Sequence, residues 1–167
     1  MIRPLPLLGQ AVTYAVFAAI LGVFANGPAH APAPPEKAQI VLSLIHSGKP
    51  AGECHERSAE ELAKLAPNMR RKQVCPRERV PLLVEFKVDG NTLFRDSLPP
   101  KGFAKDFPSH IHRRFAVEPG AHRIEVRLRD SNRRDGFDYE GAAEATLVPR
   151  QSLAIEFRAA KGGFVFR

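Results

Sequence analysis

The chain of 167 residues has no tryptophan and only two cysteines. Two cysteines are too few for a four-cysteine zinc site or for the disulfide framework of a cysteine-rich mini-protein. The sequence also lacks G-x-S-x-G, H-E-x-x-H, P-loop and G-x-G-x-x-G motifs, and the C-x-x-C-H motif that attaches c-type haem. These absences predict a protein that is not an enzyme, holds no cofactor and has no identifiable small-molecule substrate.

Charge is missing from most of the N-terminal region, where no charged residue lies between Arg3 and Glu36. The apolar run 5–25 would span about 31 Å as a helix, close to the thickness of membrane hydrocarbon. We therefore expect a transmembrane anchor over residues 1–26. Because Arg3 precedes the run, the positive-inside tendency places the short N-terminal end in the cytoplasm.

A cleaved signal peptide is the alternative interpretation, since Ala29-His30-Ala31 has the A-x-A form of a cleavage site. The apolar run is longer than the core of a usual signal peptide, and Pro32, which has no N–H, follows the site. Both features favour an uncleaved anchor. The predicted location is the bacterial inner membrane, with a single span and the C-terminal domain in the periplasm.

Proline marks the boundary between the anchor and the folded part. Residues 27–37 contain four prolines and predict an extended linker. Beyond it, residues 38–167 carry short apolar stretches, of which 82–88 alternates with the period of a half-buried strand. Asp89-Gly90 follows as a hairpin turn. About seven or eight such strands predict an all-β domain, an antiparallel immunoglobulin-like β-sandwich.

The segment 115–126, FAVEPGAHRIEV, resembles the V-x-P-G-x-H-x-I-x-V hairpin of PEGA-like and related immunoglobulin-like domains. The resemblance covers one hairpin. It implies a small β-sandwich used for interaction, usually without catalysis, and it implies that strand 111–117 pairs with strand 122–129.

One short helix interrupts the strands. Ser58 and Glu61 have the spacing of a capping box, and Pro67 ends the helix. The helix lies between Cys54 and Cys75. We expect these cysteines to form a disulfide, because the periplasmic side of the inner membrane is oxidising. The bridge is expected to pin this helical insert onto the sandwich. A redox-active thiol pair is the alternative, although the C-x-x-C motif is absent.

A soft-metal site is a further interpretation of the same cysteines, since thiolate, thioether and imidazole groups suit copper. The residues that could form it are Cys54, His55, Met69, Cys75, His110 and His112. Their spacing matches no metal motif. We therefore expect no bound metal, and we expect His110 and His112 to be exposed residues on one strand face.

Two other groups of titratable residues have simpler interpretations. His122 is expected to pack or form hydrogen bonds locally within its hairpin. Acidic residues gather in the loop 130–141 and could bind a divalent cation, namely Asp135, Asp138 and Glu140. Because Arg133 and Arg134 share this loop, we expect it to be a solvated loop.

The formal net charge is +7, and the excess of cations is local. Arg123, Arg127 and Arg129 share one face of a predicted strand, and Arg113 and Arg114 lie on the strand expected to pair with it. Neighbouring like charges cost energy unless an anionic surface offsets them. We therefore expect these arginines to contact partner carboxylates or anionic lipid headgroups. We do not expect nucleic acid, because the predicted location of the domain is the periplasm. If this face is only solvated, residues 70–79 are the alternative surface.

One span followed by an exterior sandwich is similar in layout to the accessory proteins of respiratory oxidases. We therefore expect a non-enzymatic accessory or assembly subunit of a membrane complex, with integral membrane proteins as its partners. A small-residue ridge in the span favours close helix packing. The alternatives are a copper-handling protein and an envelope- or substrate-binding module.

Overall fold

The computed structural model describes residues 4–27 and 34–167, and the chain divides into two compact units, 1–32 and 33–167. The first unit holds helix α1 (Pro4–Ala25). Its segment Leu7–Ala25 is long and apolar enough to cross a membrane, and none of it is buried within the protein. The polar side chains of Thr13 and Asn26 each donate a hydrogen bond of 2.9 Å to a carbonyl oxygen of the helix. The prediction of a helix with the properties of a membrane span is confirmed.

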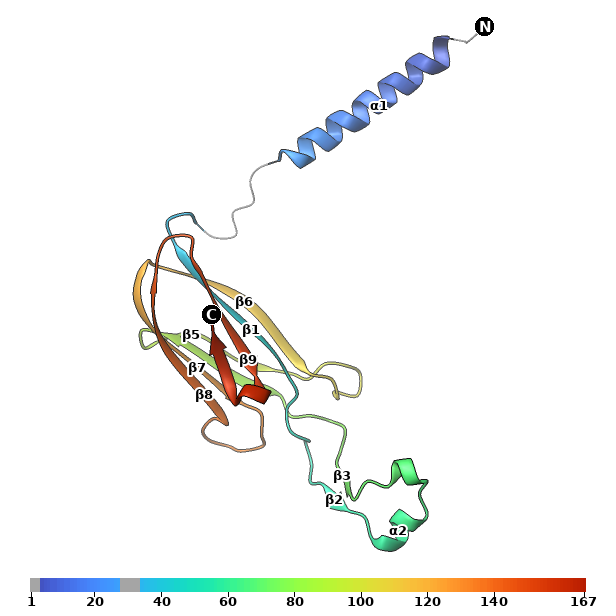
Figure 1. Ribbon diagram of the computed structural model, residues 1–167, viewed down its shortest axis with the longest axis vertical. Coiled ribbons are helices and arrows are strands. Elements are labelled where there is room, and N and C mark those ends of the chain that lie inside the picture. The colour runs from blue at the N-terminus through green and yellow to red at the C-terminus, as the bar shows by residue number, and fades with distance from the viewer. Residues whose placement is uncertain (1–3, 28–33) are drawn as a thin grey trace. The chain divides into compact units, whose positions relative to one another are not determined.

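The second unit is mostly β-structure (Figure 1). One four-stranded sheet has the order β10-β9-β1-β6, and the other has the order β5-β4-β7-β8. The bounds of these strands are β1 (Ala38–His46), β4 (Leu82–Val88), β5 (Asn91–Leu98), β6 (Ser109–Val117), β7 (Gly120–Arg129), β8 (Tyr139–Leu147), β9 (Ser152–Arg158) and β10 (Gly163–Phe166).

The remaining elements are short. A two-stranded pair forms from β2 (His55–Glu56) and β3 (Gln73–Val74), with helix α2 (Ala59–Ala63) and the 3-10 turn η1 (Pro67–Met69) between them. A second 3-10 turn, η2 (Ala159–Lys161), joins β9 to β10.

Alternating side chains from both four-stranded sheets form one hydrophobic core. Ile40 and Leu42 of β1 and Phe86 of β4 are fully buried, as are Ile124 and Val126 of β7. The alternation predicted for 82–88 is confirmed, because every second side chain from Leu82 onward lies in this core. Burial of such apolar side chains is the main favourable term that holds the two sheets together.

The predicted turn after β4 is also confirmed. Asp89 and Gly90 have φ values of 52° and 80°, and Val88 pairs with Asn91 across the turn. Two consecutive positive φ angles are the geometry of a type I′ hairpin, which Asp-Gly adopts with little strain.

The expected pairing of β6 with β7 is wrong. β6 pairs with β1 over its whole length, whereas β7 pairs with β4 and β8. The segment around Pro119 therefore carries the chain from one sheet to the other. The physical reason is non-local: the apolar strand β1 is paired along both edges, antiparallel to β6 and parallel to β9. Arg113 and Arg114 consequently lie in a different sheet from the arginines of β7.

The end of the predicted linker belongs to the domain. Residues 34–37 form a turn in which the Lys37 N–H donates to the Pro34 carbonyl, and the Lys37 carbonyl accepts from the Arg150 N–H. The expected extended conformation is therefore wrong for these four residues. Residues 28–33 of that expectation lie outside the described residues.

Candidate interaction surfaces

The cysteines form the predicted disulfide, with Cα atoms 4.2 Å apart. The predicted capping box is also present, since Ser58 and Glu61 exchange side-chain to backbone hydrogen bonds of 2.8 and 3.3 Å. The bridge, however, does not pin the helix onto the sheets. It joins the two antiparallel segments of the insert to each other, beside the β2–β3 pair.

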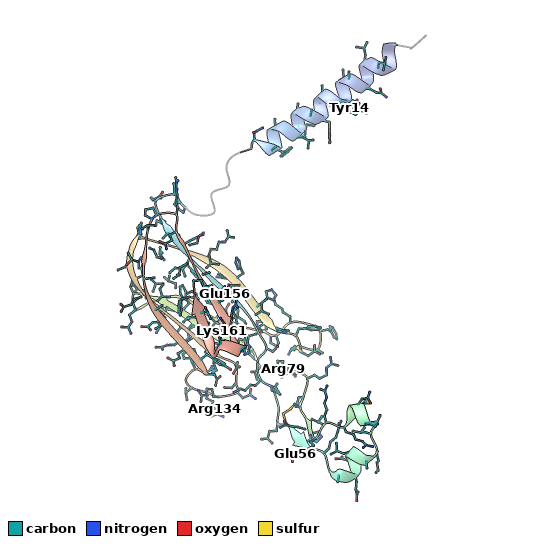
Figure 2. The ribbon with its side chains drawn as sticks, in the orientation of Figure 1. Tyr14, Glu56, Arg79, Arg134, Glu156 and Lys161 are labelled. Carbon is teal, nitrogen blue, oxygen red and sulfur yellow. A yellow bond between two sulfur atoms is a disulfide. The ribbon has the colours of Figure 1, made fainter. Side chains whose placement is uncertain are left out.

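We call residues 51–79 the arm, which extends beyond one end of the sheets (Figure 1). No residue from 51 to 78 is buried, so the arm has no hydrophobic core of its own. Figure 2 shows Arg79 at its root and Glu56 farther out. The disulfide and the backbone bonds between its two segments therefore define its shape.

The candidate metal ligands are not gathered into a site. Both sulfurs of Cys54 and Cys75 are in the disulfide, so neither is available as a thiolate. Met69 lies in η1 of the arm, whereas His110 and His112 are exposed on β6. Across residues 4–27 and 34–167, no group of three His, Cys, Asp or Glu side chains has metal-site geometry.

The acidic loop is organised by its own hydrogen bonds. The Asp138 carboxylate accepts from the backbone N–H groups of Asp130 and Ser131 and from the Ser131 hydroxyl, over 2.7 to 3.1 Å. Burial raises the pKa of this carboxyl, but the bonds from Ser131 and Asp130, together with the charges of Lys49 and Arg133, leave its pKa below the ordinary value. Arg133 adds an ion pair at 3.6 Å. Asp138 therefore acts as a cap for the loop.

His122 bonds locally, as predicted. Its Nδ1 lies 2.7 Å from Asp89 Oδ2, and its Nε2 lies 2.7 Å from the Glu118 carbonyl oxygen. The carboxylate first and the carbonyl second raise the pKa of His122. The same contact with His122, together with the Arg123 N–H, lowers the pKa of Asp89. This pair ties the β4–β5 turn to the start of β7.

Arg123, Arg127 and Arg129 share the outer face of β7, as predicted, but this face is not a row of isolated cations. Arg95, Glu85, Arg127 and Glu140 stand directly opposite one another on β5, β4, β7 and β8, and we call these four residues the charge ladder. Arg127 lies 3.5 Å from Glu140 and 3.7 Å from Glu85. The sheet therefore supplies the anionic groups that the sequence argument sought in a partner.

Glu85 is the centre of the charge ladder. It is only 4% exposed although it lies on the outer face, and Lys87 and Arg95 approach its carboxylate to 3.2 and 3.4 Å. Arg123 is also engaged, at 3.0 Å from Glu125. Removing one partner from a nearly buried ion pair is destabilising, because the other charge is left without compensation.

The other predicted arginines have different surroundings. Arg129 donates to the Arg134 carbonyl oxygen at 2.6 Å, and Arg113 lies over the ring of Phe94, 5.0 Å from its centroid. Arg114 is exposed on β6. The structure therefore does not bring all five arginines onto one surface.

Sequence reasoning missed a hairpin over residues 101–107, between β5 and β6. Lys101 and Phe107 exchange backbone hydrogen bonds of 3.0 and 3.3 Å. Gly102 has φ 85°, and a Cβ there would lie 2.4 Å from the Phe107 ring. Phe103 is fully exposed. A glycine beside aromatic residues was the available signal.

The hairpin is bonded to the root of the arm. The Arg79 N–H donates to the Lys105 carbonyl oxygen at 3.0 Å, Lys105 pairs with Glu78 at 3.3 Å, and Arg77 pairs with Asp106. The hairpin and the arm therefore belong to the same end of the domain.

A buried contact fixes the N-terminal segment at the root of the arm, residues 46–51, to the sheets. His46, the last residue of β1, bonds to the Asp130 carboxylate at 2.8 Å, and Asp130 is 3% exposed. The Asp130 carbonyl accepts from the Lys49 N–H at 2.7 Å, and Asn132 donates to the Ala51 carbonyl at 3.2 Å. Both segments of the arm are thus fixed to loops of the sheets.

Comparison with protein-family models, with curated proteins and with solved structures finds no match for this chain.

Proposed function

We propose that this protein is a non-enzymatic accessory or assembly subunit of a bacterial inner-membrane complex, with one membrane span and its β domain in the periplasm. A respiratory complex is the setting that the layout suggests. The observation that carries the proposal is the combination of an apolar, unburied helix with a domain whose most prominent feature is a projecting arm. Such an arm offers surface to a partner and adds nothing to the core of its own domain.

We further propose that the two sheets form an immunoglobulin-like sandwich. Two four-stranded sheets with a shared core, largely antiparallel pairing and repeated crossing of the chain between the sheets support this interpretation. Domains of this architecture commonly serve as interaction modules.

The span itself can contribute to assembly. Ala15, Ala18, Ala19 and Gly22 follow one another at helical spacing, and a Cβ built on Gly22 meets no atom within 4 Å. Small residues in such a pattern let the backbone of a second helix approach closely. The partner we propose is therefore an integral membrane protein that contacts both the span and the exterior domain.

Docking through the arginines of β6 and β7 stays a prediction. Arg123 and Arg127 already face carboxylates of their own sheet, so a partner would have to compete with these contacts. Anionic lipid headgroups near Arg113 or Arg114 remain part of the same prediction.

The proposed function is tested by purifying the full chain from its native membranes in a mild detergent. We expect the protein to resist alkaline extraction, to begin at or near Met1, and to carry integral membrane proteins at fixed stoichiometry. A protein that starts at Pro32 or Pro34, or that purifies alone under gentle conditions, contradicts the proposal.

A further inference from the structure

We propose that the end of the domain formed by the arm and the 101–107 hairpin is the docking site for an acidic surface of a partner protein, with Phe103 as its apolar anchor. This inference rests on the proposed function and names the chemistry of the partner.

The first observation is a strip of unopposed cations. Residues 64–72 contain Lys64, Arg70, Arg71 and Lys72 and no acidic residue. All four side chains are exposed, and none takes part in an ion pair within residues 4–27 and 34–167. Three of them are consecutive, and like charges held together are unfavourable without an anionic partner.

The second observation is that the strip has a defined shape. The Arg70 Nε donates to the Leu65 carbonyl at 3.0 Å, and the Met69 N–H donates to the Ala66 carbonyl at 2.8 Å. The Lys72 carbonyl accepts from the Arg57 N–H at 2.8 Å. These bonds and the neighbouring disulfide hold the backbone of the segment and the Arg70 side chain in place, which lowers the entropy lost on binding.

The third observation is the exposed aromatic ring. Phe103 occupies the tip of a hairpin that is bonded to the root of the arm, and Lys101 and Lys105 flank it in the sequence. Isolated exposed charges contribute little to affinity because water competes for them. A large apolar side chain that enters a pocket of the partner supplies the binding free energy that the charges do not. Interface hot spots usually contain such a buried aromatic side chain.

The place of this surface within the domain follows from strand β1. The chain enters the domain at Lys37, before the first residue of β1, and the arm leaves after its last residue, His46. Nine extended residues span about 30 Å. The basic strip therefore lies at the opposite end of the sheets from Lys37. Guanidinium groups match the geometry of carboxylates, so the partner surface is expected to carry Asp or Glu.

The test is site-specific photo-crosslinking of the full chain in its native membranes. A photoreactive residue replaces Met69 on the arm or, as the matched control, Val148 at the chain-entry end; their exposed fractions are 59% and 58%. We expect a discrete protein adduct at position 69 that is absent at position 148. Adducts to lipid alone at position 69, or the same protein adduct at both positions, overturn the proposal.

Charge variants identify the contacts. In the triple variant R70Q/R71Q/K72Q the adduct is expected to fall roughly tenfold at low ionic strength and less at high ionic strength. F103A is expected to lower it by a similar factor at any ionic strength. The control R150Q/R167Q removes two exposed charges away from this end of the domain, as many as R71Q/K72Q removes from it, and is expected to leave the adduct unchanged. Because R70Q removes the bond to Leu65, R71Q/K72Q serves as the milder variant.

The outcomes separate this inference from the proposed function. If the wild-type protein co-purifies with a membrane partner and both R70Q/R71Q/K72Q and F103A retain that partner fully, the docking inference is wrong and the proposed function stands. If the wild-type protein has no partner at all, both are wrong. If the arm variants instead lose binding to vesicles of phosphatidylglycerol and keep their protein partner, the surface is a lipid-binding one and the proposal fails.

Discussion

The charged sheet face and the arm use the same residue types in opposite ways. On the sheet, Arg127 lies within 3.7 Å of three glutamates, one of which, Glu85, is nearly buried. On the arm, Arg71 and Lys72 are exposed and take part in no ion pair within the described residues. The first set has its counter-charges within the fold, and the second leaves them to be supplied by another molecule. An arginine-rich segment therefore indicates a docking surface only when the fold has not already neutralised it.

The largest effect that sharpens this comparison is expected from the disulfide. In C54S/C75S the arm should lose roughly 3 kcal/mol of stability, because the bridge closes a loop that has no core. The two sheets should keep their structure, since no residue from 51 to 78 is buried against them. Amide hydrogen exchange by residue checks this: fast exchange confined to the arm is expected, and equal loss of protection in β4 and β7 would contradict it.

The next effect concerns the charge ladder. R127Q should lower the free energy of unfolding by about 1–2 kcal/mol, because it leaves the nearly buried Glu85 with fewer cations. R129Q is the matched control on the same strand face, because Arg129 bonds to a carbonyl and, among the described residues, to no carboxylate. In E85Q/R127Q much of the loss should be recovered, which a double-mutant cycle in urea measures. Equal decreases in the free energy of unfolding in R127Q and R129Q would show that the charge ladder is not the source of this stability.

The smallest effect is a pH dependence at the Asp89–His122 pair. The pKa of His122 is raised, so its contribution to stability is complete below the ordinary value of about 6.5 and is lost as pH rises through the folded-state pKa. The pKa of Asp89 is lowered, so its contribution is present above about 3.8 and is lost as pH falls through the folded-state pKa.

The thermal midpoint of the wild-type protein should therefore exceed that of H122Q most clearly in mildly acidic buffer. The difference should shrink above neutral pH. H110Q removes an exposed histidine of β6 and serves as the control, with no change of this kind expected. A difference between wild type and H122Q that is constant from pH 5 to pH 9 would rule out this linkage.

Local features of the structure could be predicted from the sequence, and non-local ones could not. The helix α1, the capping box of Ser58, the Asp89-Gly90 turn and the buried face of β7 each depend on residues close together in the chain. The disulfide was predictable because the chain has only two cysteines.

The charge ladder combines side chains from four strands, and its register was not available from any one segment. The same limit explains the wrong partner assigned to β6 and the expectation that the disulfide would pin the insert onto the sheets. The position of Phe103 beside the root of the arm likewise depends on contacts between distant segments, such as Lys105 with Glu78. Sequence periodicity indicates which face of a strand is buried, but it does not indicate which strand lies beside it.

The most direct test of the central claim is to measure both stability and partner retention for two variants of the full chain. R123Q/R127Q is expected to lower the thermal midpoint while the membrane partner still co-purifies, because these arginines serve their own sheet. R70Q/R71Q/K72Q is expected to keep the thermal midpoint. In a salt titration, this variant is expected to release the partner at a lower salt concentration than the wild-type protein does. The reverse pattern, in which the sheet variant loses the partner and the arm variant keeps it, would contradict the account.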